Sequence, residues 1–84
     1  MYHFEWDEIK SQRNQRKHGI SFQEAKSCFY DPNLSNDEDR EILIGHSNEG
    51  RLLLVVCTIR NNKIRIISAR KASKQEANDY AKEI

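Results

Sequence analysis

The side chains of this sequence that could carry out chemistry are cations and hydroxyls placed among aliphatic residues. The stretch from Arg51 to Arg70 reads RLLLVVCTIRNNKIRIISAR. Five polar residues interrupt its apolar runs: Thr58, Arg60, Arg65, Ser68 and Arg70. An arginine in a strand that otherwise looks buried needs a partner, and a phosphate group is one such partner.

A second set of polar residues lies between positions 8 and 18. At helical spacing they share or adjoin one face: Lys10, Arg13, Asn14, Arg16 and Lys17. A helix this polar either lies on the surface or contacts a polyanion. His18 stands at its end, where the helix dipole stabilises the charged imidazole, so His18 is a candidate acid or base.

These residue types fit the cleavage of RNA. Cleavage without a metal needs a group that takes the proton from the 2′-OH, cations for the charge that grows on the phosphate, and an acid for the 5′-oxygen. Arginine supplies the second of these through parallel hydrogen bonds. The sequence has no Gly-rich phosphate loop and no G-x-S-x-G motif, and its three histidines are too scattered to indicate a zinc site. We therefore expect neither a metal nor a cofactor.

Each candidate also has a structural explanation. Arg70 could pair with an acid such as Asp79 or Glu83, and Arg60 could be a solvated turn residue. For the others the alternatives are a helix cap (His18), a surface position (Lys17), the core (Tyr80) and the sheet (Thr58 and Ser68). Arg60 and Arg70 would lie about 30 Å apart along a straight strand, so they cannot hold one phosphate together. We assign Arg70 to the scissile phosphate, because chain order places it beside the last helix.

The element that must position most of these residues is a β-hairpin over residues 51–70. Asn61-Asn62 separates the two apolar runs, and Asn tolerates the positive φ of a tight turn. A two-residue loop predicts three cross-strand pairs: Ile59 with Ile64, Cys57 with Ile66 and Val56 with Ile67. Both faces of the hairpin are largely apolar, so we expect central strands that are covered on both sides.

The N-terminal part of the sequence predicts a strand and two helices. Three alternating aromatic residues would share one face of the strand: Tyr2, Phe4 and Trp6. Asp7 is placed to cap a helix that runs to about Lys17, ends at His18-Gly19 and offers only Ile9 to a core. A second helix follows from the capping box of residues 21–24 to Asp31-Pro32, and its core face carries Phe22, Ala25, Cys28 and Phe29.

The remaining residues predict two further segments around the hairpin. Residues 33–39 are polar and acidic and predict a loop, residues 41–46 predict a strand, and residues 47–50 predict a turn. Ser73 and Glu76 form a capping box before a last helix, whose apolar stripe contains Ala77, Tyr80, Ala81 and Ile84. The order is β-α-α-β-β-β-α. It predicts an α+β fold in which an antiparallel meander sheet is covered by two N-terminal helices and one C-terminal helix.

Composition bounds the class of protein. With 84 residues and charged residues at 32%, the sequence predicts one small soluble domain over residues 1–84. It contains no apolar run long enough to span a membrane and no signal peptide, and Cys28 and Cys57 predict buried thiols in a reducing cytoplasm. The net charge is +1, but residues 31–50 hold six acids and one base, whereas residues 51–84 hold eight bases and three acids. Such segregation can present a basic face, although a mixed solvated surface is the alternative.

Four segments covering most of the chain resemble the BrnT family of bacterial type II toxins. They are WDEIKSQRNQRKHGISFQEAKSCFYDP, EILIGHS, GRLLLVVCTIR and RIISARKASKQEANDY. The resemblance implies a RelE-like ribonuclease fold and an endoribonuclease that cleaves mRNA and arrests growth. It also implies neutralisation by BrnA, a ribbon-helix-helix antitoxin normally encoded just downstream, in a complex that binds and represses its own promoter.

The family motifs match this sequence at eight polar positions: Lys17, His18, Arg51, Thr58, Arg60, Ser68, Arg70 and Tyr80. Many members carry a polar or acidic residue where this sequence has Ile59, and often a His where it has Cys57. If either residue carries a proton in those relatives, this chain lacks it, so the general base stays open.

The sequence therefore predicts a metal-independent endoribonuclease toxin that leaves a 2′,3′-cyclic phosphate. The expected catalytic residues are Lys17, His18, Arg60 and Arg70, and the expected substrate contacts are Lys10, Arg13, Arg51, Thr58, Ser68 and Tyr80. A non-catalytic RNA- or protein-binding module of the same fold is the alternative. The antitoxin is expected to cover the basic surface with acidic residues, or to bind the exposed part of the last helix.

Overall fold

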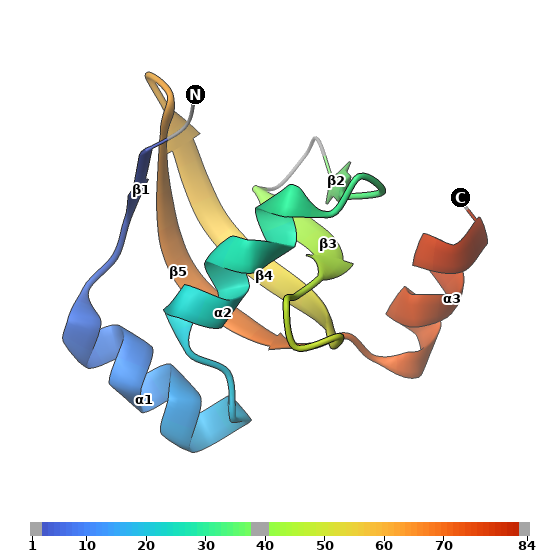
Figure 1. The fold of residues 1–84 in the computed structure, drawn as a ribbon, viewed down its shortest axis with the longest axis horizontal. Coiled ribbons are helices and arrows are strands. Elements are labelled where there is room, and N and C mark those ends of the chain that lie inside the picture. The colour runs from blue at the N-terminus through green and yellow to red at the C-terminus, as the bar shows by residue number, and fades with distance from the viewer. Residues whose placement is uncertain (1–2, 38–40, 83–84) are drawn as a thin grey trace.

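The chain folds into a five-stranded mixed sheet with its main helical layer on one face (Figure 1). The computed structural model describes residues 3–37 and 41–82. Four strands form an antiparallel meander: β2 (Ser35–Asp37), β3 (Ile42–His46), β4 (Leu52–Arg60) and β5 (Lys63–Lys71). β1 (His3–Glu5) pairs with β5 in parallel, which gives the spatial order β1-β5-β4-β3-β2.

Three helices and one 3₁₀ turn complete the fold. α1 (Glu8–His18), α2 (Phe22–Ser27) and the turn η1 (Cys28–Tyr30) come between β1 and β2, and α3 (Lys74–Lys82) follows β5. None of the helices in the described ranges is long and apolar enough to cross a membrane. The predicted order β-α-α-β-β-β-α fits the observed one, to which the short strand β2 is added before β3.

Two expectations about the sheet are wrong. The sheet is mixed rather than wholly antiparallel, because β1 enters at the far edge and runs in the same direction as β5. The predicted loop of residues 33–39 contains β2, while residues 38–39 lie outside the described part. β2 reads Ser-Asn-Asp and has no apolar alternation, so only its backbone pairing with β3 makes it a strand.

The central hairpin turns where the sequence predicts, but its register shifts once. Asn61 and Asn62 have φ of 51° and 65°, as a tight hairpin turn requires. The predicted pairs Ile59 with Ile64 and Cys57 with Ile66 are confirmed, whereas Val56 pairs with Ser68 and not with Ile67. Ile67 is an extra residue in β5, a β-bulge that the two-residue loop alone could not reveal.

The core lies between α2 and one face of the sheet. Fully or nearly buried residues from the two layers make it up: Ile20, Phe22, Ala25 and Cys28 from the helical layer, and Leu43, Leu53, Val55, Cys57, Ile64, Ile66 and Ala69 from the strands. Phe4 and Trp6 pack against it as predicted; Tyr2 lies outside the described residues. The two cysteine thiols are unpaired and buried, and burial raises the pKa of Cys28 to about 12 and of Cys57 to about 11.

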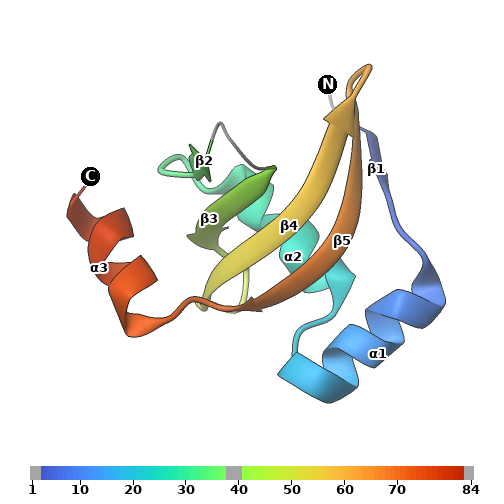
Figure 2. The ribbon, with the colours of Figure 1, turned by 180° about the vertical axis from the view of Figure 1, so that it is seen from behind.

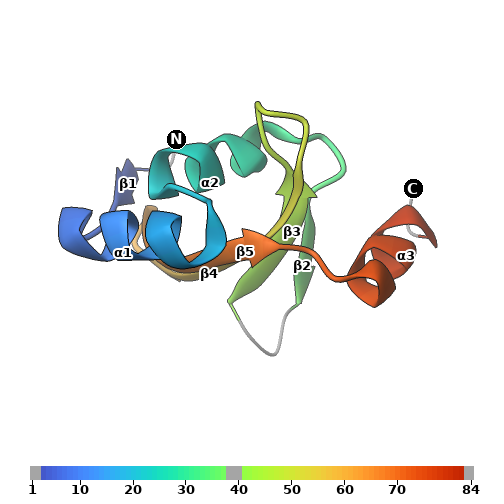
Figure 3. The same ribbon diagram turned by 90° about the horizontal axis from the view of Figure 1, so that it is seen from below.

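The predicted cover on both sides of the sheet is wrong. Seen from behind, β3, β4 and β5 lie in front of α2, and α3 stands beside β3 instead of over the strands (Figure 2). The view from below shows the same asymmetry, with α1 and α2 on one side of the sheet (Figure 3). In α3 only part of the predicted stripe is buried: Tyr80 is buried and Ala77 half-buried, whereas Ala81 is exposed and Ile84 lies outside the described range.

The helix ends follow the predicted local rules, with one difference in each N-terminal helix. Asp7 caps α1 by accepting hydrogen bonds from the N–H groups of Ile9 and Lys10, and Gly19 ends it at φ 73°. Ile9 was the residue that α1 was predicted to offer to the core, but its side chain is 61% exposed and does not anchor the helix. In α2 the Ser21 hydroxyl caps the helix as predicted, by accepting from the N–H of Glu24. The Glu24 carboxylate instead binds Arg51, so only the serine half of the capping box forms.

Candidate functional site

A cationic groove runs between α1 and the second half of β5. Its volume is about 250 Å³, and it is lined by Lys10, Arg13, Asn14, Lys17, His18, Ile67 and Ser68. We call this the α1–β5 groove. Five of its lining residues are among the site residues that the sequence predicts: Lys10, Arg13, Lys17, His18 and Ser68.

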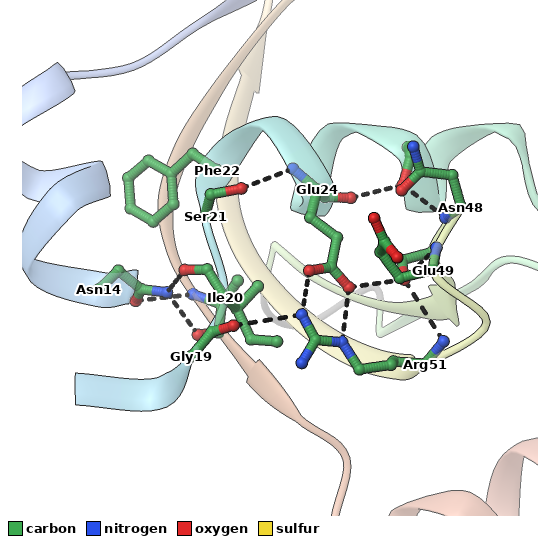
Figure 4. Close-up of polar contacts among 12 residues, drawn as sticks. Asn14, Gly19, Ile20, Ser21, Phe22, Glu24, Asn48, Glu49 and Arg51 are labelled. Atoms are coloured by element: carbon green, nitrogen blue, oxygen red, sulfur yellow. Dashed lines mark hydrogen bonds and ion pairs between the residues drawn. The ribbon is translucent and has the colours of Figure 1, made fainter. Parts of the chain in front are cut away.

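Two buried polar side chains fix α1 in place. Asn14 is 8% exposed and lies at the edge of β5, where β1 has already ended. Its amide nitrogen donates to the carbonyls of Ile20 (2.7 Å) and Ala69 (2.8 Å), and its amide oxygen accepts from the Ala69 N–H at 3.2 Å. The Ser11 hydroxyl accepts from the N–H of Phe22 at 3.0 Å. These polar contacts replace the apolar anchor that α1 lacks, and Figure 4 shows Asn14 beside Ile20.

The register of α1 then decides which cations face the groove. Lys10, Arg13 and Lys17 are three or four residues apart, so they form one row along the helix. They are exposed, while His18 is only half exposed at the last turn. On the opposite wall, the bulge at Ile67 places Ile67 and Ser68 next to each other at the groove.

The charge of the groove is not neutralised within the part of the chain that the structure describes. No ion pair between these described side chains involves Lys10, Arg13 or Lys17. The row of cations can therefore contact an external polyanion without first giving up a carboxylate. His18 adds an imidazole at the end of the row.

Arg51, predicted to contact substrate, connects secondary-structure elements through hydrogen bonds. Its guanidinium donates to both carboxylate oxygens of Glu24 and to the carbonyl of Gly19, 3.2 Å away (Figure 4). Ser47 also donates to Glu24, at 2.7 Å. The hydrogen bond from Arg51 lowers the pKa of the Glu24 carboxyl despite its burial. The network joins the end of α1, α2 and the turn before β4, so the guanidinium is already occupied.

Arg70, predicted at the scissile phosphate, is bound to a carboxylate. Its Nη1 and Nη2 donate to the two oxygens of Glu76 at 2.8 and 2.9 Å. Glu76 also closes the predicted capping box, because it accepts from the Ser73 N–H at 2.7 Å. The hydrogen bond from Arg70 holds the pKa of Glu76 at about 2. The sequence alternative of an acidic partner is thus realised, although with Glu76 rather than Asp79.

Tyr80 belongs to a third cluster, which lies next to β3, toward the opposite edge of the sheet from the α1–β5 groove. Its hydroxyl donates to Asp31 Oδ2 at 2.7 Å, and His46 Nδ1 lies 3.3 Å from the same oxygen. Burial raises the pKa of Asp31, but hydrogen bonds from the backbone of His46 and Asn33 outweigh it, and the pKa falls to about 2. Tyr80 is buried and attaches α3 to the sheet, which matches the core position given as the alternative to its predicted substrate contact.

Thr58 and Arg60 lie at the hairpin end of β4, both exposed. Arg60 pairs in register with Lys63 next to the turn, whereas Arg70 lies near the other end of β5. The structure therefore separates Arg60 from Arg70, as the length of the strand predicts. Neither residue lines the α1–β5 groove.

Comparison with known proteins identifies the family of this chain. The sequence model of the family described as "Ribonuclease toxin, BrnT, of type II toxin-antitoxin system" matches residues 6–76. The chain belongs to the BrnT family. The structure is also similar to the crystal structure of the Brucella abortus ribonuclease toxin BrnT. The TM-score is 0.66 and the identity 26%, and the match covers 88% of this chain and all of that one. Among curated proteins, none matches this chain.

Family membership makes this chain a ribonuclease toxin of the type II class. A BrnT-family chain acts on RNA, and the α1–β5 groove offers a row of cations with a histidine at its end. Among the residues that the structure describes, no group of three or more His, Cys, Asp or Glu side chains is arranged to hold a metal ion.

Sequence reasoning missed three contributors to these arrangements. Asn14 was counted with the polar face of the helix, but its amide completes the edge of β5. Ile67 was placed in a regular strand. The sequence gives His46 no role beyond the rejected zinc site, whereas its Nδ1 lies 3.3 Å from Asp31 Oδ2. A polar residue amid the otherwise polar α1 carries no sequence signal that it is buried, so only the packing identifies Asn14.

Proposed function

We propose that this chain is an endoribonuclease toxin that binds and cleaves mRNA in the α1–β5 groove without a metal ion. The observation that carries the proposal is the row of Lys10, Arg13 and Lys17, which no described carboxylate neutralises, ending at His18. RNA presents one phosphate per nucleotide, so a linear row of cations fits its backbone.

Each groove residue has a role in this proposal. Lys10 and Arg13 hold flanking phosphates, and Lys17 stabilises the charge that develops on the scissile phosphate. His18 transfers a proton, either from the 2′-OH as a base or to the 5′-oxygen as an acid. Ser68 donates a hydrogen bond to the phosphate or ribose. Attack of the 2′-oxygen on phosphorus breaks the bond to the 5′-oxygen and leaves a 2′,3′-cyclic phosphate and a 5′-hydroxyl.

The other predicted residues take less direct roles. Arg60 and Thr58 are exposed at the hairpin end and would contact the RNA chain away from the bond that is cleaved. Arg70 would reach a phosphate only by releasing Glu76, so we place Lys17 rather than Arg70 at the scissile phosphate. Arg51 and Tyr80 support the fold through Glu24 and Asp31.

We further infer that residues 1–84 form one RelE-like toxin domain acting in the cytoplasm, where mRNA is available. A BrnA-like ribbon-helix-helix antitoxin would neutralise it, and the complex would bind its own promoter. Membership of a toxin–antitoxin family supports the existence of an antitoxin partner, and the resemblance of the sequence motifs supports its class.

The test is cleavage of a 5′-labelled single-stranded RNA by the pure protein, with and without EDTA. The expected result is cleavage that EDTA does not slow, with products that end in 2′,3′-cyclic phosphate. His18→Ala and Lys17→Ala should lose the activity. Arg16→Ala is the matched control, because Arg16 is an exposed cation of the same helical turn that does not line the groove.

Three results would count against the proposal. Equal activity of the Lys17 and Arg16 variants would remove the groove as the site, and inhibition by EDTA would contradict metal independence. RNA that is bound but stays intact would favour the alternative of a non-catalytic binding module. That alternative has one observation on its side, since Ile59 and the buried Cys57 thiol offer no proton carrier in the hairpin.

A further inference from the structure

The face of the sheet opposite α2 has an apolar centre, over which no helix of the described residues lies (Figure 2). At one end of this face α3 contacts His46 through Tyr80, and Ser68 and Arg70 of β5 border the centre. Cross-strand register assigns its central residues: Ile42 pairs with Val56, and Ile44 pairs with Leu54. With Leu52 they form a strip that we call the open-face strip. These residues alternate with Leu43, Leu53 and Val55, which face the core.

This strip is more apolar than a solvent face requires. A sheet with one wet face alternates apolar residues inside with polar residues outside, yet β3 and β4 place five aliphatic side chains outside. Leu54 is only 7% exposed, whereas the other four are half-buried. A contiguous apolar surface of this kind marks a protein interaction site.

The border of the strip carries positive charge toward the hairpin end. Arg60, Lys63 and Arg65 lie on the same face, all exposed. Arg65 Nη1 lies 3.8 Å from the carboxylate of Glu5, which is itself half exposed to solvent. The carboxylate of Glu41 accepts a hydrogen bond from the N–H of Ile59, next to Arg60. An apolar centre with a basic border fits a partner that has an apolar centre and acidic residues on one side. A second copy of this chain fits less well, since its border would bring the same bases.

We propose that the open-face strip is the docking surface for the antitoxin, which contributes an apolar segment bordered by acidic residues. The inference rests on membership of a type II toxin–antitoxin family and is independent of the catalytic roles proposed above. Val56 of the strip pairs with Ser68, and Ser68 also lines the α1–β5 groove. A segment docked on the strip therefore reaches the rim of the groove and obstructs the path of an RNA strand.

Two substitutions test this surface with purified toxin and the purified antitoxin encoded with it. Ile44→Glu puts a charge at the centre of the strip, and Arg65→Glu reverses a charge on its exposed border without touching the core. Gln23→Glu is the control, because it adds the same charge to an exposed position on α2, on the covered side. Calorimetric titration of antitoxin measures binding without RNA, and thermal melting confirms that each variant is folded.

The expected result is antitoxin binding weakened at least tenfold by Ile44→Glu and by Arg65→Glu, and unchanged by Gln23→Glu. Both open-face variants should cleave RNA at the wild-type rate and resist neutralisation. Wild-type affinity in both variants would overturn the proposal. So would a wild-type dimer that Ile44→Glu dissociates while antitoxin affinity is unchanged, because a second copy would then occupy the strip. Absence of RNA cleavage by the wild type and by every variant, with antitoxin binding affected as expected, would count against the ribonuclease proposal alone.

Discussion

The cations of α1 and the arginines at the ends of β4 and β5 differ in what surrounds them. Lys10, Arg13 and Lys17 line an open groove without a described carboxylate partner. Arg51 and Arg70 each bind both oxygens of one glutamate. In the sequence all five are basic residues near polar neighbours. An arginine such as Arg51 or Arg70 has a better geometry for binding phosphate than a lysine. We infer from this difference that available charge, and not residue type, selects the site.

The largest contrast should come from comparing the RNA cleavage rate and the stability of one variant from each region. His18→Ala should lower RNA cleavage about 100-fold or more, since it removes the proton carrier, while the free energy of unfolding changes by less than about 0.5 kcal/mol. Arg51→Ala should do the reverse. It leaves Glu24 buried without its cation, so the melting temperature falls while the folded fraction still cleaves RNA. Single-turnover rates and thermal melts separate the two, and a folded but inactive Arg51→Ala would contradict the comparison.

Asn14 connects the two regions, because it holds the cationic helix against β5. Asn14→Ala leaves the Ile20 and Ala69 backbone groups without partners and should cost about 3 kcal/mol in urea unfolding. Ser11→Ala, the matched control, breaks one hydrogen bond of the same helix to Phe22 and should cost about 1 kcal/mol. At temperatures where both variants are folded, only Asn14→Ala should raise KM for RNA, since the row of cations loses its register. Equal KM values would reduce Asn14 to a purely structural residue.

Acid should weaken the paired arginines and leave the groove cations charged. The folded-state pKa of Glu76 is about 2, below its ordinary value of 4.5, so its ion pair with Arg70 is fully present above about pH 5. The contribution is lost as pH falls toward 2. After allowance for solvent exposure of the pair, it is on the order of 2 kcal/mol. Glu76→Gln should flatten this part of the stability–pH curve measured by urea unfolding. A variant curve parallel to the wild type would show that other carboxyls, such as Asp31, dominate.

The smallest expected effect is on the salt dependence of RNA binding. Each groove cation that neutralises a phosphate contributes about 0.7 to the slope of log K against log salt for a single strand. Lys10→Ala and Arg13→Ala should each lower the slope by about that amount, whereas Arg16→Ala should not. The measurement is fluorescence anisotropy with an uncleavable 2′-deoxy analogue at several salt concentrations. Identical slopes for all three variants would place the RNA elsewhere.

The sequence predicts the local features of the fold well, because their signals are local. Asp7 acts through hydrogen bonds to the first turn of α1, and Gly19 and the two asparagines of the hairpin act through backbone conformation. Each behaves as expected. The residues that fail depend on packing between distant segments. β2 exists only through pairing with β3, and Glu24 leaves its capping box only because Arg51 is within reach.

The candidate site follows the same division. Helical spacing places Lys10, Arg13 and Lys17 on one face, which is enough to predict a basic row. It cannot show that Arg70 meets Glu76, because two pairings with other acids were equally open in the sequence. Nor could it show that α3 leaves a sheet face open, since the stripe of Ala77 and Tyr80 predicts a covering helix.

The extra residue of β5 makes one deletion worth constructing. Without Ile67, the pairs Cys57 with Ile66 and Val56 with Ser68 would follow one another directly, and inward and outward side chains would alternate regularly along the strand. The hairpin can therefore close without it. The shortened strand would be straighter and would lose an apolar wall residue of the groove. A chain lacking Ile67 should still fold, and its binding and cleavage of RNA would report on the curvature of the strand together with the loss of this wall residue.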